Sequence, residues 1–327
     1  MSEAVLQVQD LHVYYHTRAG AVRAVDGVTF DLDRGIRMGL VGESGCGKST
    51  LAMSLLRMIK RPGRIESGRA LLNGGGGDAE DLANVSDRRM RELRLQEISL
   101  IPQGAMNSLN PVMRVRDQIL DGLEDHGVRL SNSAARERVN ALLESVDLDL
   151  QVADMHPHEL SGGMKQRVCV AIAISMEPSV LLADEPTSAL DVVVQRQVMA
   201  TIERLQEEMG ISMILIGHDM GLMAQSVDQL AVMYAGKLAE LGDVEVLFDD
   251  PLHPYTDLLI STLPTLEERG QFTGIPGITP ELVDPPSGCI FHPRCPRAMD
   301  ICSEVIPTWQ EVRPDHWVAC HLYEGER

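Results

Sequence analysis

A glycine-rich stretch near the N-terminus has the residues and spacing needed to bind a phosphate chain. Residues 42–49 read GESGCGKS and match the pattern G-x-x-x-x-G-K-[ST], with an expected strand at 36–41 before it and an expected helix at 51–59 after it. In this pattern backbone N–H groups face the phosphates, Lys48 reaches the β and γ phosphates, and Ser49 binds Mg²⁺. The predicted nucleotide-binding residues here are Gly42, Glu43, Ser44, Gly45, Cys46, Gly47, Lys48, Ser49 and Thr50. The stretch therefore predicts a nucleotide site.

Two adjacent acids, Asp184 and Glu185, end the apolar segment 179–183. A strand that ends beside a phosphate-binding loop would bring both carboxylates to the nucleotide. Asp184 could then hold Mg²⁺, directly or through water, and Glu185 could orient or deprotonate an attacking water. Two acids at a strand end could also be merely solvated, but a phosphate-binding loop in the same chain favours the catalytic interpretation.

The elements that must position these residues alternate between strands and helices. The predicted strands are 5–15, 21–32, 36–41, 98–102, 180–183 and 211–216, and 192–209 is a predicted helix. Such alternation predicts an α/β fold with a mostly parallel sheet. A helical insertion is expected at about 104–160, and a tail from about residue 250 is expected to lie outside the sheet.

The stretch LSGGMKQR at 160–167 opens an apolar helix. Ser161 is a suitable N-cap, and Gly162 and Gly163 let backbone amides approach an anion closely. Alone, the stretch predicts only a capped helix start. Together with the phosphate-binding loop it is the signature of the ATP-binding cassette (ABC) ATPases, and the chain resembles that family.

Four further stretches carry this resemblance. Gln103 matches the Q-loop glutamine, which contacts the metal and faces the membrane partner, and His218 matches the switch histidine, which touches the γ phosphate. Residues 188–191, SALD, match the D-loop. Tyr15 stands where the family places an aromatic ring on adenine, with Tyr14 as a one-residue alternative. The resemblance implies that Tyr15, Gln103, Ser161, Gly162, Gly163, Asp184 and Asp191 bind the nucleotide, that Ser49, Gln103 and Asp184 hold Mg²⁺, and that Glu185 and His218 are catalytic.

The resemblance also implies an architecture and an assembly. A P-loop NTPase fold is expected over residues 1–250, with a RecA-like core, an antiparallel β subdomain and a helical subdomain at about 104–160. Two such subunits would sandwich ATP and Mg²⁺ between the phosphate-binding loop of one and residues 161–163 of the other. Soluble ABC ATPases of DNA repair or translation are the alternative, but the chain has one cassette and no sustained heptads between Gln103 and Ser161.

Three stretches narrow the resemblance to importer subunits. QGAMNSLNP at 103–111, PLHPYT at 251–256 and IPG at 275–277 resemble the ATP-binding subunits of oligopeptide and dipeptide permeases. Such importers imply two membrane permease subunits, a second ATPase subunit that is a paralogue or another copy, and an extracytoplasmic solute-binding protein. The chain would then lie at the cytoplasmic face of the membrane. The same subfamily also serves nickel, glutathione and oligosaccharides, so the transported solute rests on analogy.

The acidic composition bears on other partners. The chain has 29 Lys and Arg against 48 Asp and Glu, a formal net charge of −19, which argues against a broad nucleic-acid surface. The N-terminus lacks the basic and apolar regions of an export signal. The longest nearly unbroken apolar stretch, 168–176, is about half of the ~18 residues of a membrane-spanning helix. The thiols are therefore expected to stay reduced.

Four of the six cysteines lie at the C-terminal end of the chain. They are Cys289, Cys295, Cys302 and Cys320, spaced C-x5-C-x6-C-x17-C. Zinc modules usually use C-x2-4-C pairs, whereas longer loops suit a [4Fe–4S] cluster. The resemblance to cluster-bearing permease ATPases favours iron–sulfur; zinc, with His292, His316 or His321 as further ligands, and free thiols remain alternatives. Residues 251–327 are thus an expected extension that a structural cluster stabilises.

Overall fold

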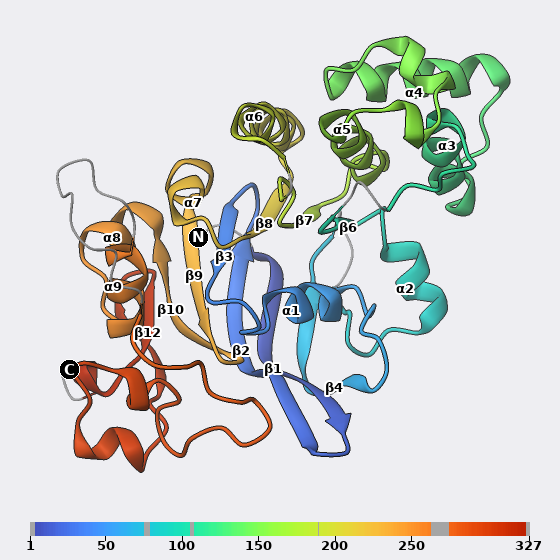
Figure 1. Cartoon of the computed structure of the whole chain (residues 1–327). Coiled ribbons are helices and arrows are strands. Elements are labelled where there is room, and N and C mark those ends of the chain that lie inside the picture. Colours follow the sequence, from blue (N-terminus) through green and yellow to red (C-terminus); the bar gives the residue numbers. More distant parts are fainter. Residues whose placement is uncertain (1–3, 75–78, 105–107, 189, 263–274, 325–327) are drawn as a thin grey trace.

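A computed structural model of the chain describes residues 4–74, 79–104, 108–188, 190–262 and 275–324. Two β-sheets and a set of helices make up this part of the molecule (Figure 1). The larger sheet has the order β11 (Trp309–Arg313), β12 (His316–Ala319), β10 (Lys237–Asp243), β9 (Gln229–Tyr234), β3 (Arg37–Val41), β8 (Ser212–Ile216), β7 (Val180–Asp184) and β6 (Ile98–Ile101). The five strands from β9 to β6 run parallel, as predicted, and β10, β12 and β11 are antiparallel.

The central strands separate two hydrophobic cores. Every residue of β7 and β8 is buried, which is typical of a parallel sheet covered on both faces. Along β7, Val180 and Leu182 face one core, and Leu181 and Ala183 face the other. Because alternate side chains point to opposite faces, one short strand anchors both halves of the cassette and fixes the position of Asp184 at its end.

The smaller sheet is antiparallel and covers one of these cores. Its order is β2 (Gly20–Asp33), β1 (Ala4–Thr17), β4 (Gly63–Leu72) and β5 (Glu80–Asp81). Helix α1 (Lys48–Leu55) lies between this sheet and the central one, and Leu51 and Leu55 are buried there. The arrangement places α1, which begins at the end of the phosphate-binding loop, against both sheets (Figure 1).

Most of the helices cover the second core or form the insertion. The helices are α2 (Asp87–Leu93), α3 (Val115–Asp125), α4 (Asn132–Ser145), α5 (Gly162–Ala173), α6 (Val192–Met209), α7 (Met220–Ser226), α8 (Val244–Asp249) and α9 (Pro254–Ser261). Short 3₁₀ turns are η2 (Leu150–Asp154), η3 (Pro157–Glu159), η4 (His292–Arg294), η5 (Asp300–Ser303) and η6 (His321–Tyr323). Helix α2 instead packs on the first core, where Met90 and Leu93 are buried. Helices α3 to α5 form a layer to one side of the sheets in Figure 1. No helix within the described ranges is both long and apolar enough to cross a membrane.

The prediction that the tail lies outside the sheet is wrong. Strand β12 of the extension pairs with β10, and β11 pairs with β12, so that the two strands complete one edge of the central sheet. The buried Glu240 carboxylate of β10 accepts a hydrogen bond from Nε2 of His316 at 2.7 Å, and Trp309 stacks on Trp317 at 6.1 Å. Pairing with β12 covers the edge that β10 would otherwise expose, and His316 adds to the N–H groups of Leu252 and His253 as a partner of the buried Glu240 carboxylate.

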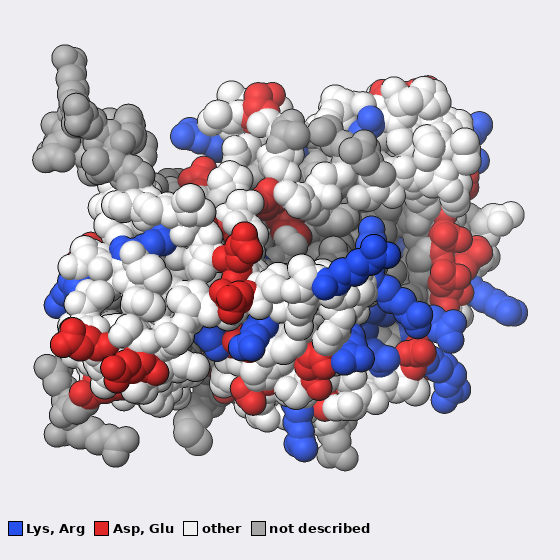
Figure 2. Space-filling model, turned by 60° about the horizontal axis from the view of Figure 1, so that its bottom comes forward, with Lys and Arg blue, Asp and Glu red and all other residues white. Residues whose placement is uncertain are grey.

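Charges of both signs mix on the surface. On the face seen in Figure 2, Lys and Arg gather towards the side of α2, with Asp and Glu among them. Arg89 of α2, for example, pairs with Glu80 at 2.6 Å and with Glu92 at 3.1 Å. Such pairing locally neutralises the basic side chains of a chain whose overall charge is acidic.

Candidate active site

The phosphate-binding loop takes a shape that only glycine allows at two of its positions. A Cβ atom on Gly42 would lie 2.0 Å from the carbonyl oxygen of Met233, and one on Gly47 would lie 2.0 Å from that of Ala24. Both glycines have positive φ, 148° and 113°. The ammonium group of Lys48, almost fully buried, donates to the carbonyl oxygens of Gly42 at 2.7 Å and Glu43 at 3.1 Å. The loop therefore holds a positive charge inside a tight backbone turn.

Ser49 and Asp184 come together from two elements. The Ser49 hydroxyl, in the first turn of α1, donates to the Asp184 carboxylate at the end of β7 at 3.2 Å. Burial raises the pKa of Asp184, and the nearby Glu185 charge adds to this effect. Hydroxyl and carboxylate oxygens are the ligands that Mg²⁺ prefers, so this pair fits a magnesium ion.

Two predicted residues, Gln103 and His218, lie after separate strands and meet at a third, Glu185. Gln103 Nε2 donates to one carboxylate oxygen of Glu185 at 2.7 Å, and His218 Nδ1 lies 3.1 Å from the other. Glu185 has a left-handed backbone with φ of 45°, held by a hydrogen bond from its N–H to the carbonyl of Ile216 at 2.9 Å. Such a conformation is uncommon for a residue other than glycine and is often found at functional sites.

These groups line one open cleft. Its walls are Tyr15, Val22, Ala24, Ser44, Gly45, Gly47, Lys48, Ser49, Thr50, Gln103, Glu185, His218 and Leu282. Tyr15 is in this cleft, and its hydroxyl lies 3.5 Å from that of Thr50. Tyr14 instead donates to Asp26 at 2.5 Å in a network with His12, outside the cleft. Of the two tyrosines, the geometry favours Tyr15 as a nucleotide contact.

The predicted signature residues lie elsewhere. Ser161 and Gly163 line a different pocket, beside Asp147 and Val194, and the Ser161 hydroxyl caps α5 by accepting from the N–H of Met164 at 3.3 Å. Asp191 is exposed and caps α6. Gly162 begins α5. One chain therefore does not bring these residues to its own phosphate-binding loop. Residues 105–107 of the Q-loop stretch and residue 189 of the D-loop lie outside the described part of the chain.

Sequence reasoning missed contacts between the extension and the loop. Arg294 Nη1 and Nη2 donate to the two carboxylate oxygens of Glu43 at 2.7 and 2.9 Å, and Thr279 donates to Glu43 at 2.7 Å. Arg294 lowers the pKa of Glu43. The predicted nucleotide ligand Glu43 thus points its side chain at the extension. Since Arg294 is 251 residues away in the chain, no local pattern could have paired them.

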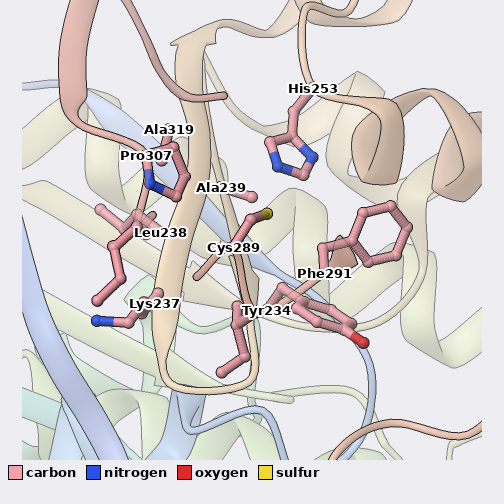
Figure 3. A pocket seen from close by; sticks show the side chains of 11 residues that line it. Tyr234, Lys237, Leu238, Ala239, His253, Cys289, Phe291, Pro307 and Ala319 are labelled. Carbon is pink, nitrogen blue, oxygen red and sulfur yellow. The ribbon is translucent and has the colours of Figure 1, made fainter. Parts of the chain in front are cut away.

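The four C-terminal cysteines are all free thiols. Cys289, beside His253 and Phe291, lines a small cavity between the β9–β10 hairpin and the extension (Figure 3). Burial raises the pKa of Cys320 to about 11, and Cys289, Cys295 and Cys302 add to the shift. Across the described ranges, no three His, Cys, Asp or Glu side chains lie close enough to hold a single metal ion. The structure therefore does not show the expected metal site as a formed ligand set.

Two known protein families match this sequence, one over most residues of the cleft and the other over part of the extension. The sequence profile of the ABC transporter family matches residues 25–188, which include the phosphate-binding loop and both carboxylates. The chain belongs to the ABC transporter family. A second family, the C-terminal region of oligopeptide/dipeptide transporters, matches residues 239–302 of this ABC transporter subunit.

Relatives match the ABC transporter subunit along nearly its whole length. A dipeptide transport ATP-binding protein, DppD of Caldanaerobacter subterraneus subsp. tengcongensis, is 40% identical over 99% of this chain and 98% of its own length. The oligopeptide transport ATP-binding protein OppD of Escherichia coli (strain K12) is 40% identical over 98% of this chain and 93% of its own length. The predicted membership among oligopeptide and dipeptide ABC transporter ATP-binding subunits is confirmed, and with it ATP binding and hydrolysis.

Solved structures share the fold of the ABC transporter subunit. A dimeric bacterial ABC transporter cassette has a TM-score of 0.65 at 23% identity and covers 73% of this chain and 98% of its own. The cbiO1 protein of Clostridium perfringens, part of the ABC transporter complex cbiONQ, has a TM-score of 0.62 at 27% identity and covers 76% of this chain and 92% of its own. These likenesses confirm the predicted P-loop ABC cassette fold.

Proposed function

We propose that this ABC subunit powers the import of dipeptides or oligopeptides through partner permease subunits. The observation that carries its motor role is the convergence of Lys48, Ser49, Glu185 and His218 on one cleft. Asp184 lies next to them, hydrogen-bonded to Ser49. The peptide solute is supported by the relatives, which are dipeptide and oligopeptide transport ATP-binding proteins. Nickel, glutathione and oligosaccharides remain the alternative solutes.

Each group in the cleft has a distinct proposed role. Lys48 binds the β and γ phosphates, because it is the buried cation of the loop. Ser49, Asp184 and Gln103 hold Mg²⁺, which when bound neutralises charge on the phosphates. Glu185 orients or deprotonates the attacking water, and His218, 3.1 Å from Glu185, contacts the γ phosphate.

A second cassette is needed to complete each ATP site. Residues 161–163 and Asp191 do not line the cleft of their own chain, so we assign them to the site of a paired subunit, which is a paralogue or another copy. In this assembly the chain contacts two membrane permease subunits at the cytoplasmic face of the membrane. A solute-binding protein outside the cell delivers the cargo.

The transported solute can be tested with the assembled transporter in vesicles. The chain is co-purified with its permease and solute-binding partners and placed in vesicles. We expect ATP enclosed in these vesicles to drive uptake of labelled dipeptides or oligopeptides. Lys48→Ala should abolish uptake. Uptake of nickel, glutathione or an oligosaccharide in place of peptides would overturn the peptide assignment, and failure to associate with any permease would overturn the transport role itself.

We also propose that Cys289, Cys295, Cys302 and Cys320 hold a [4Fe–4S] cluster that stabilises the extension. The all-thiol donor set fits iron–sulfur chemistry, and besides burial the charges of Cys289, Cys295 and Cys302 raise the pKa of Cys320, which supports their proximity. A cluster spans a larger volume than a single ion, so its ligands need not crowd as a zinc site would. Anaerobically purified protein is expected to be brown; a colourless protein with stoichiometric zinc would contradict the cluster.

A further inference from the structure

A segment of the extension lies against the nucleotide cleft, outside every motif described above. Leu282 lines the cleft together with Tyr15 and Val22, although it lies well beyond the cassette in sequence. Its side chain is partly buried against the adjoining core. The apolar surface of the cleft thus includes one side chain from the C-terminal extension beside those from the cassette.

The segment that carries Leu282 is fixed from two sides. The carbonyl oxygen of Leu282 accepts a hydrogen bond from the N–H of Arg23, on β2, at 3.0 Å. The next residue, Val283, fits against Gly20, where a Cβ atom would come within 2.9 Å of its Cγ1. Upstream, Thr279 donates to Glu43 of the phosphate-binding loop at 2.7 Å. Leu282 is therefore held in register with both β2 and the phosphate-binding loop.

The cleft has residues of two chemical kinds. Lys48, Ser49 and their neighbours supply charge and hydrogen bonds, which suit phosphates. Tyr15, Val22 and Leu282 supply apolar surface, which suits the flat face of a purine base. We propose that Leu282 is a nucleotide-binding residue that packs against the adenine base together with Tyr15. The extension then contributes directly to ATP affinity.

The contact between Leu282 and the base can be tested by comparing the affinity for ATP with the affinity for tripolyphosphate, which has no base. In the full-length protein, Leu282→Ala is expected to raise the Kd for ATP roughly fivefold, because a partly buried aliphatic contact is lost. The Kd for Mg²⁺–tripolyphosphate, which has no base, should stay unchanged. Ile278→Ala is the matched control, since Ile278 lies four residues away in the same segment and is 90% exposed. This control should leave both affinities unchanged.

The Leu282→Met variant tests whether a loss of ATP affinity in Leu282→Ala comes from disturbed folding. It keeps the volume of the side chain, so ATP affinity should return close to the native value while folding is preserved. Unchanged ATP affinity in Leu282→Ala would overturn the proposal. An equal loss of ATP and tripolyphosphate affinity would also overturn it, because Leu282 would then act through the phosphate-binding loop and not on the base.

Discussion

Glu185 differs from its neighbour Asp184 in both backbone and surroundings. Asp184 is buried at the end of β7 and accepts from Ser49, whereas Glu185 has a φ of 45° and lies between Gln103 and His218. A left-handed conformation costs about 1–3 kcal/mol, and hydrogen bonding by the adjoining strand maintains it. The two acids are adjacent in sequence, but their environments differ, which supports the proposed roles of metal binding for Asp184 and catalysis for Glu185.

The Glu185→Gln variant is expected to bind ATP and to lose hydrolysis. The amide keeps the size of the side chain and can still contact Gln103, but it cannot accept a proton from water. We expect the rate to fall at least about 100-fold, with the Kd for ATP close to native. Both quantities can be measured on the assembled transporter. Lys48→Ala is the comparison, since it should weaken ATP binding itself; near-native turnover by Glu185→Gln would remove Glu185 from the base role.

Arg294 and Glu43 form an ion pair that joins the extension to the phosphate-binding loop. The Arg294 side chain is 5% exposed, so its loss leaves Glu43 partly buried without its main partner. Arg294→Ala is expected to lower the free energy of unfolding by about 2–3 kcal/mol. A double-mutant cycle with Glu43→Ala, measured by urea denaturation at neutral pH, should give a coupling of about 1–3 kcal/mol. If the changes in the free energy of unfolding caused by the two single substitutions simply add up in the double variant, Arg294 and Glu43 do not interact directly.

At the scale of residues, the sequence predicts what local spacing determines. Lys48 and Ser49 follow from the glycine pattern, and the pairing of Asp184 with Ser49 follows from a strand end beside that loop. The contacts of Arg294 and Leu282 do not follow, because they depend on how the extension folds back over the cassette. Side chains separated by long stretches of chain meet only through tertiary packing, which no periodicity encodes.

At the scale of elements, buried strands are the easiest to predict. β7 and β8 are uniformly apolar, and their predicted ranges agree with the structure to within a residue. β4 went unpredicted because much of it is polar and partly exposed, so its pattern resembles a loop. β12 is only four residues long, too short for a clear alternating pattern, and it pairs with β10 far away in the sequence, where His316 contacts the buried Glu240.

The extension is expected to lose stability at acid pH because a histidine caps helix α9. His253 caps this helix: its Nδ1 accepts from the N–H of Tyr255 at 3.0 Å, which requires that nitrogen to be unprotonated. Burial lowers the pKa of His253 to about 4. As the pH falls, His253 therefore takes up a proton in the unfolded state at a higher pH than in the folded state. The stability that neutral His253 contributes to the fold is fully present above about pH 6.5 and is lost as the pH falls towards 4.

The acid effect can be isolated with one substitution. Between pH 7 and pH 5, protonation of His253 in the unfolded state should cost about 2 kcal/mol of stability. His253→Asn keeps an N-cap acceptor but cannot titrate in this range, so its urea midpoint should change less between the two pH values. An equal pH dependence in the native protein and the variant would contradict this role of His253.

At the scale of the whole molecule, the residues proposed for one ATP site fall into two separate regions of the chain, which is what the proposed pairing of two cassettes requires. The cleft around Lys48 faces a different surface region from the pocket that includes Ser161 and Gly163. The resemblance to ABC ATPases predicts that residues 161–163 serve the site of another subunit. In the structure they do not line the cleft around Lys48. Under the proposed pairing, hydrolysis would depend on association of two cassettes, so the forces between subunits would control the rate together with the chemistry of the cleft.

Association of two copies of this chain should strengthen with salt. Each copy carries a formal charge of −19, so like-charge repulsion opposes a homodimer. Raising the ionic strength from about 0.1 M to about 1 M shortens the Debye length from about 10 Å to about 3 Å and screens that repulsion. Sedimentation of the ATP-loaded Glu185→Gln chain should therefore show a larger dimer fraction at high salt.

The control for this effect is ATP affinity measured at both ionic strengths, because salt also screens the contact between Lys48 and the phosphates. A dimer that weakens with salt at saturating ATP would contradict net repulsion and would mean that opposite charges meet across the interface. A chain that stays monomeric at both ionic strengths would exclude the homodimer. Its second cassette would then have to be a chain of more basic surface, because such a partner removes the repulsion that two identical copies cannot avoid.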